Sequence, residues 1–194
     1  KKLEPNMLKI AKEIEFDFIL TLLDMEDNGI KVNQSKLMEL IDKNNTQLES
    51  LKVQIYELCG IKFNINSTKQ LGEVLFDELK LPSKKKTKTG YSTDESVLSE
   101  LVELHPCVAK ILEYRELYKL QSTYCEPILN LAQKDVDSRV YTSFIHTGTA
   151  TGRLASKNPN LQNIPARGSY AKPFRAVFEA KDGSYMPIAI EDII

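Results

Sequence analysis

The chain has 194 residues, of which 42% are hydrophobic, and its formal net charge is −1. This composition fits a soluble globular protein that can bury an ordinary core. No apolar run approaches the roughly 20 residues of a membrane span, and residues 1–14 lack the apolar core of a signal peptide, so a cytoplasmic location is expected.

The first two predicted elements are helices. Apolar residues recur at helical spacing from Met7 to Met25, and Gly29 supplies a stop. A longer helix is expected from Ser35, which can cap it, to Cys59, because apolar residues and Asn44 follow one another in steps of four and three. Such steps are typical of a helix packed along a partner.

A basic loop then interrupts the helical pattern. A short helix with apolar residues on its inner face should begin at Ser67 or Thr68. Residues 80–93 hold Pro, Gly and five lysines without apolar periodicity, which predicts a loop. Thr93 can cap the helix that follows.

A further helix is expected from His105 toward Pro127, where the missing backbone donor forces a kink or a restart. The spacing divides its residues between a polar face and a core face, Arg115, Lys119 and Ser122 against Leu117, Leu120 and Tyr124. A polar face of this kind is in most helices only solvated.

The pattern changes after residue 133. Residues 139–147 alternate as a strand does, and residues 176–180 and 185–190 are further strand candidates. The expected fold is therefore mainly α with a smaller α+β part. Residues 1–132 form a helical module with a basic tip loop at about 80–93, and residues 133–194 begin an α/β module that is incomplete.

Cysteine usage and charge distribution narrow the function classes. Three cysteines without CxxC spacing and only two histidines argue against structural zinc and a disulfide framework, and favour buried thiols. Residues 79–93 carry five basic residues and no acid, and residues 138–178 carry six and no acid. These eleven of the 26 basic residues leave 15 against 27 acids, about −12, which indicates one basic face that meets phosphate.

The second acid-free window contains the most informative segment, His146 to Gly168, with the sequence HTGTATGRLASKNPNLQNIPARG. Asn160, Gln162 and Asn163 carry donors and acceptors, and Arg153 carries a fork of donors. Every base pair presents acceptors in the minor groove, so donors aimed there can test base-pair shape without reading sequence. The alternative is a turn-rich loop whose amides satisfy their own backbone.

The same residues carry a family resemblance. TATGRLASKNPNLQNIPARG followed by FRAVF resembles the signature of family A DNA polymerases, the DNA polymerase I type, in which TGRLSS, a spacer and PNLQNIP precede a basic residue. Residues 63–98 and YRELYKLQSTY at 114–124 resemble the thumb of that family in the same order. The resemblance runs from about Phe16 to about Ala180.

The resemblance implies a helical thumb followed by the first strands of a polymerase palm, and a primer-template duplex as partner. It places the tip loop along the duplex backbone, the helix at 114–124 near the primer strand, and the amide-rich segment near the template and the terminal base pair. The residues it implies in DNA binding are Lys84, Lys85, Lys86, Lys88, Thr89, Ser92, Arg115, Lys119, Thr123, Tyr124, Thr151, Arg153, Asn160, Gln162, Asn163 and Arg167.

The chemistry of the family needs two carboxylates that hold Mg²⁺ against the primer hydroxyl and the triphosphate. Glu191 or Asp192 falls roughly where the first would stand, but the expected residues do not follow it, so no metal role is assigned. The fingers segment that binds nucleotide is absent. Mg²⁺ and deoxynucleoside triphosphates are thus expected only in a longer parent polymerase, in the bacterial cytosol or nucleoid or in an organelle, and this chain alone is expected to be inactive.

Two functions remain open. In the first, the chain is a piece of a replicative or repair DNA polymerase and contributes the grip on duplex DNA. In the second, it is a non-catalytic DNA-binding or helical interaction module with a polymerase-like surface. An open reading frame that continues through two acidic strands would favour the first.

Overall fold

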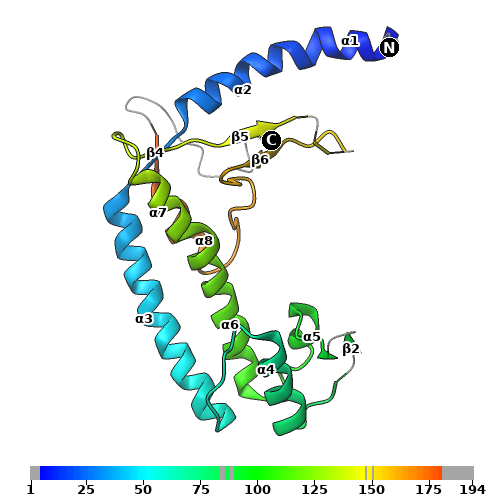
Figure 1. Ribbon diagram of the computed structural model, residues 1–194, viewed down its shortest axis with the longest axis vertical. Helices are drawn as coiled ribbons and strands as arrows, with labels where there is room; N and C mark the ends of the chain where they lie inside the picture. Colours follow the sequence, from blue (N-terminus) through cyan, green and yellow to red (C-terminus); the bar gives the residue numbers. More distant parts are fainter. Residues whose placement is uncertain (1–4, 84–85, 88–89, 147, 150, 181–194) are drawn as a thin grey trace. The chain divides into compact units, whose positions relative to one another are not determined.

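The computed structural model describes residues 5–83, 86–87, 90–146, 148–149 and 151–180 (Figure 1). The chain folds into two compact units, one made of residues 1–38 and 124–194 and the other of residues 39–123. The sequence-based division near residue 133 concerned thumb and palm subdomains, and that assignment stays a prediction.

The first unit opens with a helical stretch of three parts, α1 (Pro5–Ile10), the π-helical η1 (Ala11–Glu15) and α2 (Phe16–Asn28). Gly29 ends it, as the sequence predicts, with φ +54°. A Cβ at this position would lie 2.8 Å from the Val140 carbonyl oxygen, so a glycine is needed for both backbone conformation and space.

A small antiparallel sheet follows, in the order β4–β1–β7. Its strands are β1 (Ile30–Val32), β4 (Arg139–Val140) and β7 (Phe178–Glu179). In register, Ile30 lies opposite Val140 and Val32 lies opposite Phe178. The strand candidate at 176–180 is thus confirmed at its centre, whereas the candidate at 185–190 lies outside the described residues.

The single strand expected at 139–147 is wrong in extent. β4 pairs with β1, but the chain changes partner after Val140, and β5 (Ser143–Ile145) pairs with β6 (Ala155–Lys157) in a separate hairpin. Buried Thr142 lies between the two strands and its hydroxyl reaches the carbonyls of Lys157 and Pro159. Alternation in sequence cannot reveal such a change of partner.

The remaining helices of this unit are η3 (Gln121–Cys125), α7 (Glu126–Ala132) and α8 (Ala171–Arg175). The first three residues of η3 belong to the second unit. The predicted restart before Pro127 is confirmed, because the π-helical η3 interrupts the helix and α7 begins at Glu126. Val140, Phe174, Val177 and Phe178 are buried in the core.

The second unit is built on the long helix α3 (Gln34–Cys59), whose first turns belong to the first unit. Its end at Gly60, with φ +70°, matches the prediction. Its cap does not, because Asn33 rather than Ser35 holds the first turn, its Oδ1 accepting from the Lys36 N–H at 2.9 Å. Asn33 is an equally good cap, and sequence spacing did not separate the two residues.

After α3 come α4 (Thr68–Gly72), the π-helical η2 (Glu73–Glu78), the hairpin of β2 (Lys86–Thr87) and β3 (Gly90–Tyr91), α5 (Glu95–Ser99) and α6 (Pro106–Leu120). Ser67 caps α4 as predicted, its Oγ accepting from the Gln70 N–H. The expected loop at 80–93 contains a short antiparallel hairpin. The cap expected at Thr93 is wrong: α5 follows Asp94, and Thr93 binds Arg115.

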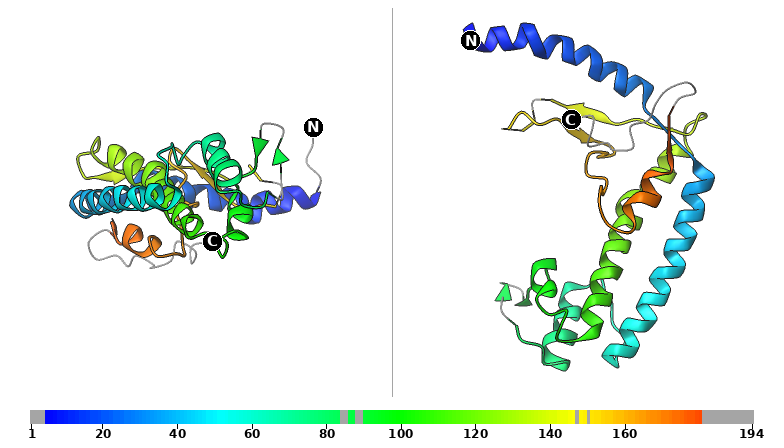
Figure 2. Two further views of the ribbon diagram at one scale, coloured as in Figure 1. Left: turned by 90° about the horizontal axis from the view of Figure 1, so that it is seen from below. Right: turned by 180° about the vertical axis from the view of Figure 1, so that it is seen from behind.

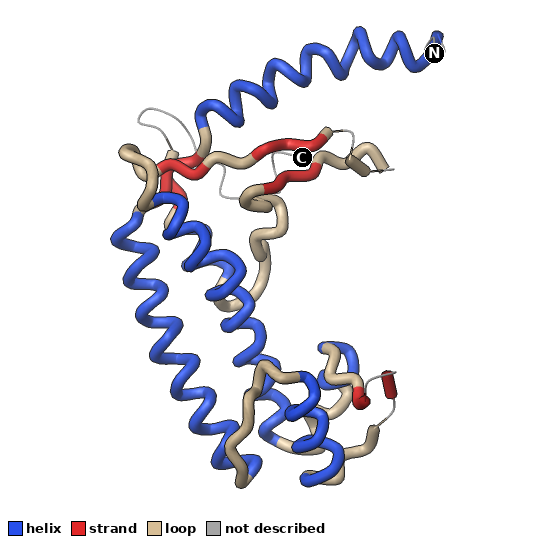
Figure 3. Tube along the Cα trace, in the orientation of Figure 1, coloured by secondary structure: helices blue, strands red, loops and turns tan. Residues whose placement is uncertain are grey.

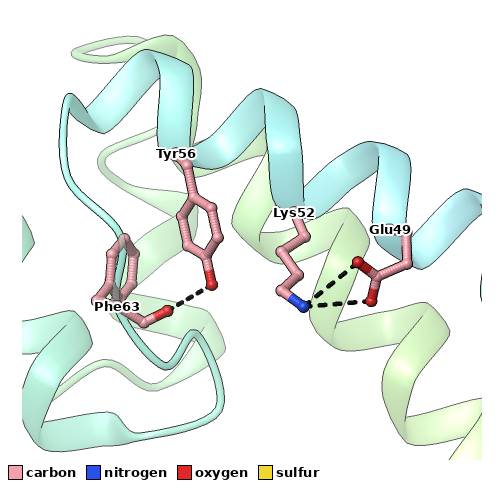
Figure 4. A network of polar contacts seen from close by, with 4 residues as sticks. All are labelled: Glu49, Lys52, Tyr56 and Phe63. Carbon is pink, nitrogen blue, oxygen red and sulfur yellow. Dashed lines mark hydrogen bonds and ion pairs between the residues drawn. The ribbon is translucent and has the colours of Figure 1, made fainter.

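Figure 4 shows how the end of α3 is joined to the chain that follows. The Tyr56 hydroxyl donates to the Phe63 carbonyl at 2.7 Å, and the two rings meet edge to face with centroids 5.8 Å apart. One turn earlier, Lys52 pairs with Glu49 at 3.2 Å. Tyr56 therefore fixes the return of the chain beside α3, while the exposed ion pair contributes little.

The described residues are mainly helical, and strands occur only in one three-stranded sheet and two hairpins (Figure 3). The predicted fold class, mainly α with a smaller α+β part, is confirmed. No helix in the described part of the chain is both long and apolar enough to cross a membrane.

Candidate nucleic-acid interface

The amide-rich segment, called the amide loop from here on (residues 151–168), folds around one buried serine. Ser156 lies in β6, and its hydroxyl accepts from the backbone N–H groups of Leu161 at 3.1 Å and Gln162 at 3.4 Å. The same hydroxyl donates to the side-chain oxygen of Asn160, 3.2 Å away. The turn that follows β6 is thus closed by side-chain oxygens rather than by a strand partner.

Asn160 has two ends with different surroundings. Its Oδ1 accepts from the N–H groups of Gln162 at 3.1 Å and Asn163 at 3.3 Å, which makes an Asx turn. Its side chain is exposed, and its NH₂ group donates to no residue among those described. The alternative in which the amides satisfy their own backbone therefore holds for the oxygen of Asn160 and leaves its donors facing solvent.

Two further hydroxyls hold the segment in place. The Thr142 hydroxyl lies 2.7 Å from the Pro159 carbonyl and 3.1 Å from the Lys157 carbonyl. Tyr124 is buried, and its hydroxyl donates to the Asn163 carbonyl. Burial raises the pKa of the Tyr124 phenol, so it remains a donor at neutral pH.

The predicted DNA contacts in the first unit differ in how exposed their side chains are. Gln162 is half-buried and lines an apolar cavity of about 430 Å³ beside α2. Tyr124 is buried against Phe174, with ring centroids 6.1 Å apart. The other predicted contacts have exposed side chains, namely Thr151, Arg153, Asn160, Asn163 and Arg167.

Arg153 lies in the connection between β5 and β6. Its carbonyl accepts from the Thr149 hydroxyl at 2.7 Å, which bends the backbone. Its guanidinium is exposed and pairs with no carboxylate in the described part of the chain. An ion pair that would let Arg153 hold this turn therefore has no partner among these residues.

In the second unit, Arg115 does not extend freely from its helix. Its guanidinium donates to the Thr93 carbonyl and, at 3.3 Å, to the Thr93 hydroxyl. Burial lowers the pKa of Arg115, against the attraction of Asp94. Ser92 is buried, and its hydroxyl donates to Asp94 at 2.8 Å. These hydrogen bonds hold the chain in place where the tip loop ends and α5 begins.

The remaining predicted contacts of this unit are only partly described. Lys119 and Thr123 are exposed. Lys86 contributes backbone to β2. The predictions for Lys84, Lys85, Lys88 and Thr89 lie outside the described residues.

A metal site is not formed by the described residues, which contain no group of three or more His, Cys, Asp or Glu side chains able to hold an ion. Glu191 and Asp192 lie outside the described residues. Among the residues that the structure describes, none is therefore assigned to Mg²⁺.

The residues that shape the amide loop were missed from sequence. Ser156 lies just before Asn158-Pro159, a turn where bonds from side-chain hydroxyls to the backbone are common, so the sequence carried a signal for it. Thr142 carries no such signal, because it lies far from that turn along the chain and meets Pro159 only in the fold. Their partners Pro159, Leu161 and Gln162 are visible only in the structure.

Comparison with known proteins agrees with the motif and the fold. The model of DNA polymerase family A matches residues 34–192. DNA polymerase I of Helicobacter pylori is 46% identical over 189 residues, which are 97% of this chain and 20% of that protein. DNA polymerase I of Caldicellulosiruptor bescii is 48% identical over 174 residues, 90% of this chain and 20% of that protein.

A solved structure gives the same result. The polymerase domain of Pol1 from M. smegmatis, in complex with DNA primer-template and dNTP, matches 91% of this chain and 31% of its own, with a TM-score of 0.82 and 38% identity. The chain spans about a fifth of the length of the curated relatives it matches. Because the family match covers most of the chain and the motif lies within it, the chain belongs to DNA polymerase family A.

Proposed function

We propose that this chain grips the primer-template duplex within a DNA-directed DNA polymerase, through the duplex backbone and the minor groove. Template-directed nucleotidyl transfer belongs to the longer protein. The observation that carries the proposal is the amide loop, where Arg153, Asn160, Asn163 and Arg167 are exposed in a segment without any acid. The solved relative binds DNA primer-template, which supports the same partner here.

The chemistry of the loop suits a partner of fixed shape and variable sequence. Purine N3 and pyrimidine O2 accept hydrogen bonds in the minor groove of every base pair. The donors of Asn160 and Arg153 are exposed, while the loop backbone is fixed by Ser156, Thr142 and Tyr124. Donors on a fixed backbone lose less entropy on binding than donors on a mobile one.

The basic residues of the second unit add affinity for DNA that does not depend on the base sequence. Lys119 is exposed there, and the lysines of the tip loop carry no neighbouring acid in sequence. Lysines near phosphates release counterions, so they raise affinity for any duplex. We assign residues 1–132 to the thumb and residues 133–194 to the beginning of the palm.

Mg²⁺ and deoxynucleoside triphosphates belong, in this proposal, to the longer polymerase. Mg²⁺ would neutralise the charge that develops on the transferring phosphoryl group. Within this chain we assign no residue to that ion, because the described residues offer no suitable set of ligands. A cytoplasmic location stays a prediction.

Fluorescence anisotropy with a labelled primer-template duplex tests the proposal directly. We expect saturable binding with an affinity that falls steeply with salt and differs little between duplexes of unrelated sequence. The quadruple variant T151A/R153A/N160D/R167A, still folded by circular dichroism, should bind at least tenfold more weakly. Undetectable binding at low salt, or equal binding by this variant, would instead favour the helical interaction module.

A further inference from the structure

Within the 39–123 unit, α3 and α6 lie side by side and run in opposite directions (Figure 2). Asn44 Nδ2 donates to Gln121 Oε1 at 3.1 Å, and Gln47 Nε2 donates to Glu113 Oε1 at 3.3 Å. Residue numbers rise along α3 as they fall along its partner. Both contacts agree with the antiparallel direction of the pair.

Buried residues recur along both helices. They are Asn44, Leu48, Leu51, Ile55 and Cys59 in α3, and Cys107, Ile111, Tyr114 and Leu117 in α6 with Gln121 directly after it. Asn44 meets Gln121 at one end of these two runs, and Cys59 meets Cys107 at the other. Steps of three and four keep all of these residues on one face of each helix. A polar pair therefore closes one end of these runs and a thiol pair closes the other.

The two thiols contact each other. Cys59, the last residue of α3, is hydrogen-bonded through sulfur to Cys107 in the first turn of α6. Cys59 is 9% exposed and Cys107 is fully buried. The hydrogen bond from Cys107 lowers the pKa of Cys59, and the same bond together with burial raises the pKa of Cys107. Cys59 is therefore the thiol that ionises first and the one nearer to solvent.

The third cysteine provides an internal comparison. Cys125 is fully buried in the other unit, and burial raises its pKa to about 12. A thiol held neutral and away from solvent reacts slowly with oxidants. The three thiols are thus distinguishable by position and by acidity.

We propose that Cys59 and Cys107 form a reversible disulfide when the protein meets a hydroperoxide. The Cys59 thiolate attacks one peroxide oxygen, the O–O bond breaks, and hydroxide leaves and takes up a proton to become water. The Cys107 sulfur then attacks the sulfenic sulfur, gives up its proton, and a second water leaves. Two thiols lose two electrons in total, and hydrogen peroxide takes them up. A dithiol reductant reverses the reaction.

The bond would join the end of α3 to the start of α6 and close a loop that contains α4, η2, the tip hairpin and α5. Cross-linking a loop of this length removes freedom from the unfolded chain. The oxidised chain should therefore melt higher, by roughly 5 °C or more. This single conditional bond differs from the permanent disulfide framework that the cysteine pattern argues against.

The test treats the folded 194-residue chain with hydrogen peroxide, removes the peroxide with catalase, unfolds the protein and alkylates it with iodoacetamide. We expect the oxidised chain to take up one alkyl group instead of three, and its peptide map to link the peptides of Cys59 and Cys107. Dithiothreitol should restore three alkylation sites. Cys125→Ser is the matched control and should form the same bond.

Cys59→Ser and Cys107→Ser should each abolish the bond. The peptide map of the unmodified sequence keeps the test valid if either variant fails to fold. Peroxide that leaves three alkylatable thiols in the folded chain would overturn the proposal and leave the pair as packing groups. So would a bond that includes Cys125, a bond between two chains, or sulfinic acid at Cys59 without a bond.

Discussion

At the scale of single residues, variants of Arg153 can distinguish binding of the duplex from alignment of the primer end. One exposed donor fork adds little to a grip dominated by phosphate contacts, but it can align a primer end, and a misplacement of about 1 Å can cost roughly 100-fold in rate. In a longer polymerase that contains this chain, Arg153→Ala should lower single-turnover extension by roughly 100-fold and duplex affinity by less than about 10-fold. Single-turnover kinetics and anisotropy on one preparation measure both.

Arg153→Lys is the conservative control for that experiment and should rescue extension only in part, since an ammonium lacks the planar fork. The melting temperature should stay unchanged in both variants, because no carboxylate among the described residues pairs with Arg153. A loss confined to melting temperature would remove Arg153 from the interface.

The oxygen and the NH₂ group of the Asn160 side chain can be tested separately, because only the oxygen holds the turn. Asp keeps the acceptor used by the N–H groups of Gln162 and Asn163 and removes the donors that face solvent. Asn160→Asp should therefore keep the melting temperature and weaken duplex binding. Asn160→Ala should lower the melting temperature by about 2–4 °C, as loss of roughly 1 kcal/mol predicts. Thermal melts and anisotropy check the pair.

The negative charge that Asn160→Asp introduces needs its own control. Asn158→Asp adds the same charge two residues away, at an exposed side chain with φ +57°, a conformation that Asp tolerates. If N158D weakens binding as much as N160D does, general repulsion explains both losses. The donors of Asn160 would then have no demonstrated role.

At the scale of elements, the lysines of the tip loop remain a prediction from sequence. Changing Lys84, Lys85, Lys86 and Lys88 to alanine should weaken binding about equally for unrelated duplexes. The slope of log affinity against log salt should become flatter by at most about 0.9 for each lost phosphate contact. A salt series by anisotropy on two unrelated duplexes measures this slope.

Lysines of the same unit that lie beside glutamates provide the matched control. In the control variant, alanine replaces Lys52, Lys69 and Lys110, which pair with Glu49, Glu73 and Glu113. Its salt slope should stay close to that of the unmodified chain. If the tip variant and the control variant behave alike, the tip loop is only a solvated turn.

Helices could be predicted from this sequence more fully than strands. The ends of the first two helices were marked by Gly29 and Gly60, residues that adopt positive φ. The strands β1 and β6 were missed because three-residue strands carry too little periodicity. Caps failed where neighbouring residues were chemically equivalent, as with Asn33 and Ser35.

The same limit applied to the site. Sequence identified the amide loop from its composition, but it gave no internal partner to Tyr124, Ser92 or Arg115, which the resemblance places among the DNA contacts. The structure gives all three internal partners, Asn163, Asp94 and Thr93. Such partners are far apart along the chain or concealed in a turn, so spacing alone does not reveal them. These residues can support the interface through the segments they hold, and their direct contact with DNA stays a prediction.

At the scale of the whole molecule, we expect this chain to bind primer-template DNA without transferring nucleotides. The chain matches 31% of the solved polymerase domain, and the described residues form no metal-binding group. Transfer of a nucleotide requires metal ions that neutralise charge on the phosphates, which protein donors alone do not replace. The 194-residue chain should therefore bind primer-template and add no nucleotide when Mg²⁺ and all four triphosphates are supplied.

The assay must establish binding before it scores chemistry. The labelled primer-template is first saturated with the chain, as judged by anisotropy, and extension is then followed on a denaturing gel beside a complete family A polymerase. Bound but unextended primer is the expected result, because positioning a duplex end is not enough for transfer when the groups that stabilise the developing charge are missing. Template-dependent extension above a heat-killed sample would contradict the prediction that this chain alone is inactive.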